Sequence, residues 1–110
     1  MSKAGKLNGK LRTIEEISFD NGFIKRYLVL YQNGILEYRN ERMNVILDQQ
    51  IPIAVSNSKR ILSIAFLHNE TEDILYLASF QADHFAYRNP NMFLQKAKIT
   101  PDNLSDITLT

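Results

Sequence analysis

The sequence predicts a small all-β domain with one C-terminal helix, folded as a bent barrel or sandwich of about seven strands. β-branched and aromatic residues gather in short alternating runs, and Asn-Gly pairs and polar clusters separate these runs. Successive runs begin roughly ten residues apart, a spacing typical of sandwiches and small barrels. The 110 residues suffice for one hydrophobic core. We therefore expect a single domain over residues 9–110, preceded by a flexible arm over residues 1–8.

The first half of the chain predicts two linked hairpins. Residues 9–19 form the expected first strand and end at the turn signal Asp20-Asn21-Gly22. Residues 23–32 form the second strand, because β-forming side chains alternate along it. Asn33-Gly34 between two apolar runs indicates a hairpin with a type I′ turn, in which both central residues have positive φ. Residues 35–38 are the expected return strand.

Four further segments continue the β pattern. Residues 45–47 and 51–54 are short strand candidates, and a proline within the latter restricts it to a sheet edge or a bulge. Residues 60–67 alternate but are apolar on both faces. The polar run at 68–73 predicts a loop, and residues 74–80 predict the strand that completes a second hairpin.

The predicted helix lies near the C-terminus. Asn89-Pro90 is a typical N-cap and first-turn pair, because proline at the first helical position loses no needed donor. Residues 92–97 follow at helical spacing, and Thr100-Pro101 ends the run. The preceding segment 81–88 is compatible with either a strand or a first helical turn.

Composition and charge narrow the class of protein. The net charge of +1 provides no global field to attract nucleic acid or anionic membrane, so such a partner needs a local cluster of cations. The chain has no cysteine, which excludes a disulfide scaffold, a thiolate metal site and a cysteine nucleophile. The polar, basic N-terminus lacks the apolar segment of a signal peptide. We expect a soluble cytoplasmic protein.

Residues 9–40 resemble the opening of a pleckstrin-homology domain. The resemblance rests on Gly9-x-Leu11, on "FIKRYLVL" and on "GILEYRN". It implies a bent seven-stranded barrel capped by a C-terminal helix, and a surface that binds phosphoinositide headgroups in some members. The sequence departs from the pattern of those members, since Thr13 and Ile24 stand where they carry lysines. Arg26 matches their arginine position, and Phe93 stands nearest to the helix tryptophan of the family.

Four basic residues are the candidate ligand-binding residues. If the first two strands pair and bring them to one mouth of the barrel, they form a patch for an anionic ligand, because clustered cations bind phosphates. The other interpretation is a solvated strand face whose charge nearby carboxylates neutralise. The four candidates are Lys10, Arg12, Lys25 and Arg26, and the neighbouring acids are Glu15, Glu16 and Asp20.

The sequence carries little sign of catalysis. His68, Glu70, Glu72 and Asp73 have the residue types of a metal loop, but such a run is more typical of a solvated hairpin tip. No nucleophile elbow or histidine-carboxylate signature is present in the sequence. We expect no enzyme activity, no metal and no cofactor.

The expected function is binding. We predict a non-catalytic adaptor module that docks to a protein partner through a strand edge or a groove beside the helix, with weak binding to anionic phosphoinositide lipid. The alternative is an OB-like protein that binds single-stranded nucleic acid by stacking bases on exposed tyrosines. The tyrosines available for stacking are Tyr27, Tyr31, Tyr38, Tyr76 and Tyr87.

Overall fold

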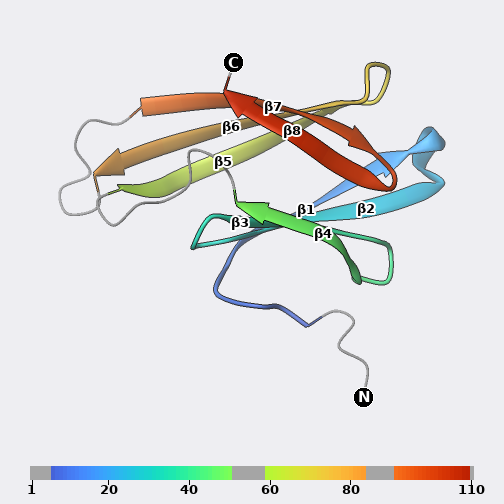
Figure 1. Ribbon diagram of the computed structural model, residues 1–110, viewed down its shortest axis with the longest axis horizontal. Coiled ribbons are helices and arrows are strands. Elements are labelled where there is room, and N and C mark those ends of the chain that lie inside the picture. Colours follow the sequence, from blue (N-terminus) through green and yellow to red (C-terminus); the bar gives the residue numbers. More distant parts are fainter. Residues whose placement is uncertain (1–5, 51–58, 84–90, 110) are drawn as a thin grey trace.

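The protein consists of two antiparallel four-stranded sheets, seen one above the other in Figure 1. The structure is a computed structural model and describes residues 6–50, 59–83 and 91–109. Within each sheet the strands follow chain order, so each sheet is a simple meander. The first sheet comprises β1 (Leu11–Phe19), β2 (Ile24–Tyr31), β3 (Ile35–Arg39) and β4 (Val45–Gln50). The second comprises β5 (Lys59–Asn69), β6 (Ile74–Asp83), β7 (Asn91–Thr100) and β8 (Asn103–Leu109).

The hydrophobic core lies between the facing sides of the two sheets. Alternation along each strand directs every second side chain into this layer. Leu28 and Leu30 of β2 are fully buried there, as are Leu75 and Leu77 of β6. The rings of Phe19 and His68 meet edge to face across the layer, with centroids 4.6 Å apart. The other buried members of the cluster are Ile17, Leu36, Tyr38, Ala97, Ile99 and Leu104.

A polar joint holds the two sheets together at the turn between β7 and β8. Arg26 Nε donates to the Pro101 carbonyl at 2.7 Å, and the Tyr38 hydroxyl donates to the Thr100 carbonyl at 2.7 Å. Gln49 Nε2 donates to the Leu104 carbonyl at 3.1 Å. Burial raises the pKa of Tyr38, although the charge of Arg26 opposes this effect, so the hydroxyl keeps its proton and remains a donor. Three successive strands of the first sheet therefore each satisfy a carbonyl of one hairpin in the second.

The predicted turn after residue 19 is confirmed. Asp20, Asn21 and Gly22 form a short 3-10 turn between β1 and β2 in which all three have positive φ. Asn and Asp tolerate this region better than other side chains, and glycine adopts it without strain. The turn signal in the sequence therefore marks the point where the chain reverses.

The hairpin between β2 and β3 is confirmed, but its turn type differs from the prediction. The Gly34 N–H donates to the Tyr31 carbonyl at 3.0 Å, which closes a four-residue turn. Gly34 then has a φ of 89°, whereas Asn33 is not among the described residues with positive φ. This is the three-residue hairpin loop in which a left-handed glycine follows the turn, not a type I′ turn.

The predicted C-terminal helix is wrong. Residues 91–100 form β7, which is paired on one side with β6 and on the other with β8. From Gln95 onward, buried residues alternate strictly with exposed ones, which is the period of a strand. The helical spacing over 92–97 is a coincidence of residue type. The run ends at Thr100-Pro101 as expected, although it is a strand. The chain then turns into β8, a strand that was not predicted.

The closed barrel is also not observed. The described strands form two separate hydrogen-bonded sheets, so the sandwich alternative describes the fold. Three sequence expectations concern residues outside the described ranges: the strand at 51–54, the N-cap at Asn89-Pro90 and the ambiguous segment beyond residue 83.

We expect Gly34→Ala to lower the free energy of unfolding by about 1–2 kcal/mol, because an L side chain resists the left-handed region that Gly34 occupies. Gly9→Ala is the matched control. A Cβ at Gly9 would lie 3.5 Å from Tyr31 Cδ1, an ordinary contact, and its φ is not in the left-handed region. Urea denaturation of both variants measures the difference. Equal stability of the two variants would contradict the assigned turn.

Candidate functional site

The four candidate cations lie at opposite ends of the β1–β2 hairpin. The Gln32 N–H donates to the Lys10 carbonyl beside the β2–β3 turn, whereas Lys25 pairs with Ser18 beside the β1–β2 turn. Five register steps separate the pair Thr13↔Leu30 from the pair formed by Lys25 and Ser18, which is about 17 Å at the rise of a strand. Antiparallel pairing therefore divides the candidates into two pairs and does not bring all four to one mouth.

Arg26 has structural contacts. Its Nη1 lies 2.8 Å from Glu41 Oε2 and donates to the Lys25 carbonyl at 2.8 Å, while its Nε makes the bond to Pro101 in the joint. Its Nη2 is also 3.8 Å from Asp102 Oδ1. Only 12% of the side chain is exposed. The guanidinium fork is thus occupied by groups of this chain.

The surroundings of Lys25 and Arg26 are mixed in charge. A surface hollow of about 540 Å³ at this end is lined by Phe23, Ile24, Lys25, Arg26 and Glu41. Phe23 is 85% exposed at the hairpin tip. The carboxylate of Glu41 pairs with Arg26, which reduces the positive field that a phosphate would meet. The binding of an anionic ligand by either cation pair stays a prediction.

A buried ion pair, which the sequence did not lead us to expect, lies on the outer face of the first sheet. Glu37 and Arg39 are two residues apart on β3, so both side chains point to the same side. Arg39 Nη2 lies 2.7 Å from Glu37 Oε1, and the two side chains are only 1% and 2% exposed. The sequence could have indicated this pair, because two opposite charges two residues apart in an apolar strand predict an ion pair on one face of that strand.

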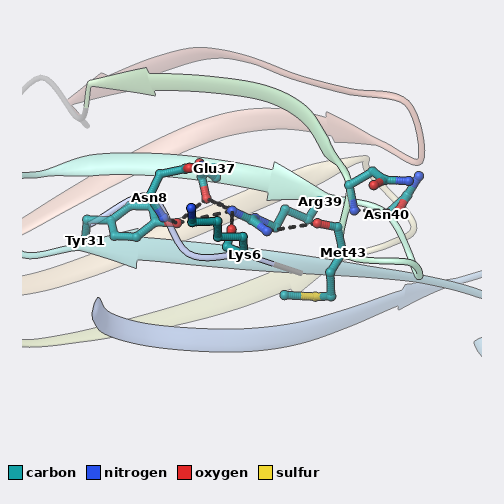
Figure 2. A network of polar contacts seen from close by, with 8 residues as sticks. Lys6, Asn8, Tyr31, Glu37, Arg39, Asn40 and Met43 are labelled. Carbon is teal, nitrogen blue, oxygen red and sulfur yellow. Dashed lines mark hydrogen bonds and ion pairs between the residues drawn. The ribbon is translucent and has the colours of Figure 1, made fainter. Parts of the chain in front are cut away.

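Hydrogen bonds from neighbouring segments complete this pair, as Figure 2 shows. The Tyr31 hydroxyl donates to Glu37 Oε1 at 2.5 Å, and Asn8 Nδ2 donates to Glu37 Oε2 at 2.7 Å. Arg39 donates to the carbonyls of Lys6 at 2.8 Å and Met43 at 2.9 Å. The backbone N–H of Asn8 donates to the Tyr31 hydroxyl oxygen at 3.0 Å. Residues 6–8, which the sequence assigns to the arm, thus lie against the first sheet.

The network determines the ionisation of its members. Burial alone would raise the pKa of Glu37, but the hydrogen bonds from Tyr31, Asn8 and Arg39 and the guanidinium charge outweigh it, so the pKa is lowered. Burial raises the pKa of Tyr31, and its hydrogen bond to the Glu37 carboxylate acts in the same direction. At neutral pH the network therefore holds a charged carboxylate, a charged guanidinium and a neutral hydroxyl. These are the states that its hydrogen bonds require.

The outer face of the second sheet carries an apolar surface, which we call the β5–β7 face. Leu67 is 67% exposed and Met92 is 69% exposed, and Phe80 and Leu94 are also exposed. A hollow of about 340 Å³ lies among these strands. The two apolar faces of segment 60–67 were the sequence signal for this surface. The β5–β7 face consists of Ala65, Leu67, Tyr76, Ala78, Phe80, Met92 and Leu94.

The register explains the shape of the hollow. Ala65 pairs with Ala78, which in turn pairs with Leu94 on β7. Leu67 pairs with Tyr76 at the next position on the same face. Two small side chains thus form a floor, and longer ones on three strands form its walls.

The tyrosines of the described residues do not form a stacking surface. Tyr31 and Tyr38 are buried, and their hydroxyls donate within the protein. Tyr27 and Tyr76 are half-buried and belong to different sheets, and Tyr87 lies outside the described residues. The platform that the nucleic-acid alternative requires is therefore not assembled by the described tyrosines.

The residues of the possible metal loop are used otherwise. The imidazole of His68 packs against the ring of Phe19, and Glu70 Oε1 accepts a hydrogen bond from the backbone of Asp20 at 2.7 Å. Within the ranges that the structure describes, no group of three or more histidine or acidic side chains is placed to hold a metal ion.

Comparison of the chain with protein-family models, curated proteins and solved structures finds no match. None of the helices within the described ranges has the length and apolar character needed to cross a membrane.

We expect Arg26→Ala to lower the free energy of unfolding by about 1–3 kcal/mol, because the Pro101 carbonyl and the Glu41 carboxylate lose a charged donor. Lys25→Ala, which removes the same charge from an exposed neighbour, should change stability by less than about 0.5 kcal/mol. Urea unfolding at matched protein concentration checks both values. A cost at Lys25 as large as that at Arg26 would contradict the structural role of Arg26.

The lowered pKa of Glu37 predicts a pH-dependent contribution to stability. The folded pKa lies below the unfolded value of about 4.3, so the contribution is complete above that pH and is lost as the pH falls through the folded pKa. We expect Glu37→Gln to cost about 3 kcal/mol at neutral pH, because it leaves Arg39 buried without its counter-charge.

The difference between this variant and the wild type should shrink in acid, because the wild-type carboxylate is then protonated as well. Glu15→Gln, at an exposed glutamate of β1, provides the control and should have a small effect at either pH. Chemical unfolding monitored at neutral and acidic pH gives the comparison. A Glu37→Gln deficit that is the same at both would contradict the assigned ion pair.

Proposed function

We propose that this protein is a non-catalytic binding module whose docking surface for a protein partner is the β5–β7 face. The observation that carries the proposal is an apolar, hollowed surface on the side of the sheet turned away from the core. Exposed side chains such as Leu67 and Met92 add nothing to the core of this chain. Covering them removes apolar area from water, which stabilises a complex by about 25 cal/mol per Å².

The chemistry of the hollow favours a protein side chain as its occupant. Its lining by the described residues is almost wholly apolar, and Tyr76 contributes the single polar side chain among them: Ala65, Phe66, Leu67, Tyr76, Ala78 and Leu94. Sites for small molecules usually add several convergent polar groups to such a lining. An apolar side chain needs no such groups, and a buried anchor in a shallow hollow is typical of protein interfaces.

The candidate cations support only a secondary role in binding anions. Lys10 and Arg12 lie at one end of the first hairpin and Lys25 and Arg26 at the other, so each end presents two of these four cations. Two cations at each end, of which Arg26 is paired with Glu41, favour weak, salt-sensitive attraction to anionic lipid over selective headgroup binding. The resemblance of residues 9–40 to pleckstrin-homology domains supports the same general class of binding module.

The proposal is tested with peptides selected from a random phage-displayed library on the immobilised protein. We expect selected peptides to bind the wild type and to lose at least about tenfold in affinity on Ala65→Arg. This variant places a charge on the floor of the hollow at an exposed position of an edge strand. Thr71→Arg, in the exposed β5–β6 turn, adds the same charge outside the hollow and should leave binding within about twofold. Fluorescence anisotropy measures the affinities.

Leu67→Ser gives a second test that does not depend on how the new arginine is accommodated. Leu67 is 67% exposed, so its loss should reduce peptide affinity while the unfolding midpoint stays near that of the wild type. The proposal is wrong if no library peptide binds, or if binding is unaffected by both Ala65→Arg and Leu67→Ser.

A further inference from the structure

Two lysines extend the β5–β7 face along β7. Along the outward side of this strand follow Met92, Leu94, Lys96 and Lys98, because the alternate positions hold residues that are partly buried at 93 and buried at 95, 97 and 99. Successive members of this row are about 7 Å apart at the rise of an antiparallel strand. Lys96 pairs with Tyr76, which lines the hollow, and Lys98 pairs with Ile74 one step further along. The apolar hollow thus passes directly into a basic strip.

The two ammonium groups differ from the guanidinium groups of Arg26 and Arg39 in what they contact. Arg26 and Arg39 form ion pairs at 2.8 Å and 2.7 Å, whereas neither lysine forms an ion pair with a carboxylate of the described residues. Both lysines are exposed. The strip therefore carries two like charges side by side. An anionic partner would offset the repulsion between them.

A second copy of this chain fits the face poorly. A symmetric pair would bring Lys96 and Lys98 into an interface that already contains their counterparts. Repulsion between these like charges favours a partner other than a second copy.

A bilayer also fits less well than a protein segment. The hollow is concave, with a floor of Ala65 and Ala78 below the side chains of Leu67 and Leu94. A flat lipid surface would contact the walls and leave the floor unfilled, and unfilled space forfeits contact energy. A single large side chain on a protein segment reaches the floor.

We infer that the partner presents an apolar anchor side chain to the hollow and acidic side chains to Lys96 and Lys98. The anchor enters between Leu67, Tyr76 and Leu94, and the carboxylates lie about 7 and 14 Å from it along β7. In an extended segment this spacing corresponds to acids two and four residues from the anchor. The inference rests on the proposed function and specifies the chemistry of the partner at that same face.

The test uses three synthetic peptides that share one anchor taken from the library selection. The first carries acids two and four residues from the anchor, the second carries glutamines there and the third carries lysines. We expect the acidic peptide to bind the wild type most tightly and to lose about tenfold in affinity on Lys96→Glu/Lys98→Glu. The lysine peptide should show the opposite preference, binding the charge-reversed protein better than the wild type.

Lys96→Gln/Lys98→Gln serves as the milder variant and should give an intermediate loss for the acidic peptide. Added salt should lower the affinity of the acidic peptide for the wild type and leave that of the glutamine peptide nearly unchanged. Both pairs of substitutions lie at exposed positions, and the unfolding midpoint verifies that the fold is retained.

The outcomes separate this inference from the proposed function. If all three peptides bind equally well to the wild type and to the charge-reversed protein, yet lose affinity on Ala65→Arg, docking stands and the acidic partner is rejected. If neither Ala65→Arg nor Leu67→Ser changes the affinity for the peptides, both proposals fail. Saturable binding to phosphatidylserine vesicles, or self-association in sedimentation, that is abolished by Ala65→Arg would overturn the inference in favour of a membrane or a second copy.

Discussion

The polar joint at the β7–β8 turn determines how the two sheets sit on one another. Apolar burial draws the sheets together, but it is non-directional and leaves their mutual placement open. Arg26, Tyr38 and Gln49 come from three neighbouring strands, and each donates to a carbonyl in residues 100–104. These carbonyls lie at the end of a ladder, where strand pairing does not satisfy all of them. Hydrogen-bond geometry therefore fixes the placement that hydrophobic packing alone would leave adjustable.

The two outer faces of the sandwich differ in whether their side chains are covered. On the first sheet, residues 6–8 and Met43 close a buried network around Glu37 and Arg39, and every charge in that network has a partner (Figure 2). On the second sheet, the β5–β7 face leaves apolar side chains in water. The first sheet thus covers its charged outer face, whereas the second sheet leaves an apolar outer face exposed, and this exposed face is the one that we propose as the docking surface.

Two arginines and two lysines of the described residues differ in their surroundings. Arg26 and Arg39 are held in ion pairs within the protein, where the planar fork of the guanidinium matches carboxylate and carbonyl groups. Lys96 and Lys98 are exposed beside the apolar hollow. A flexible lysine loses little by remaining solvated until a partner arrives, whereas a buried guanidinium must be satisfied at all times. Arg26 and Arg39 therefore serve the internal structure, whereas Lys96 and Lys98 are available for the external contact that we propose.

The β-rich class, the turn at residues 20–22 and the hairpin at residues 31–35 could be predicted from the sequence, because turn chemistry and period-two alternation are local properties. The two apolar faces of segment 60–67 were also visible in the sequence. That residues 91–100 form a strand could not be predicted, since pairing with β6 and β8 overrides a helical spacing of residue types. Likewise, only strand register separates Lys10 from Lys25 and places Lys96 beside the hollow, because side-chain neighbours in a sheet come from distant parts of the chain.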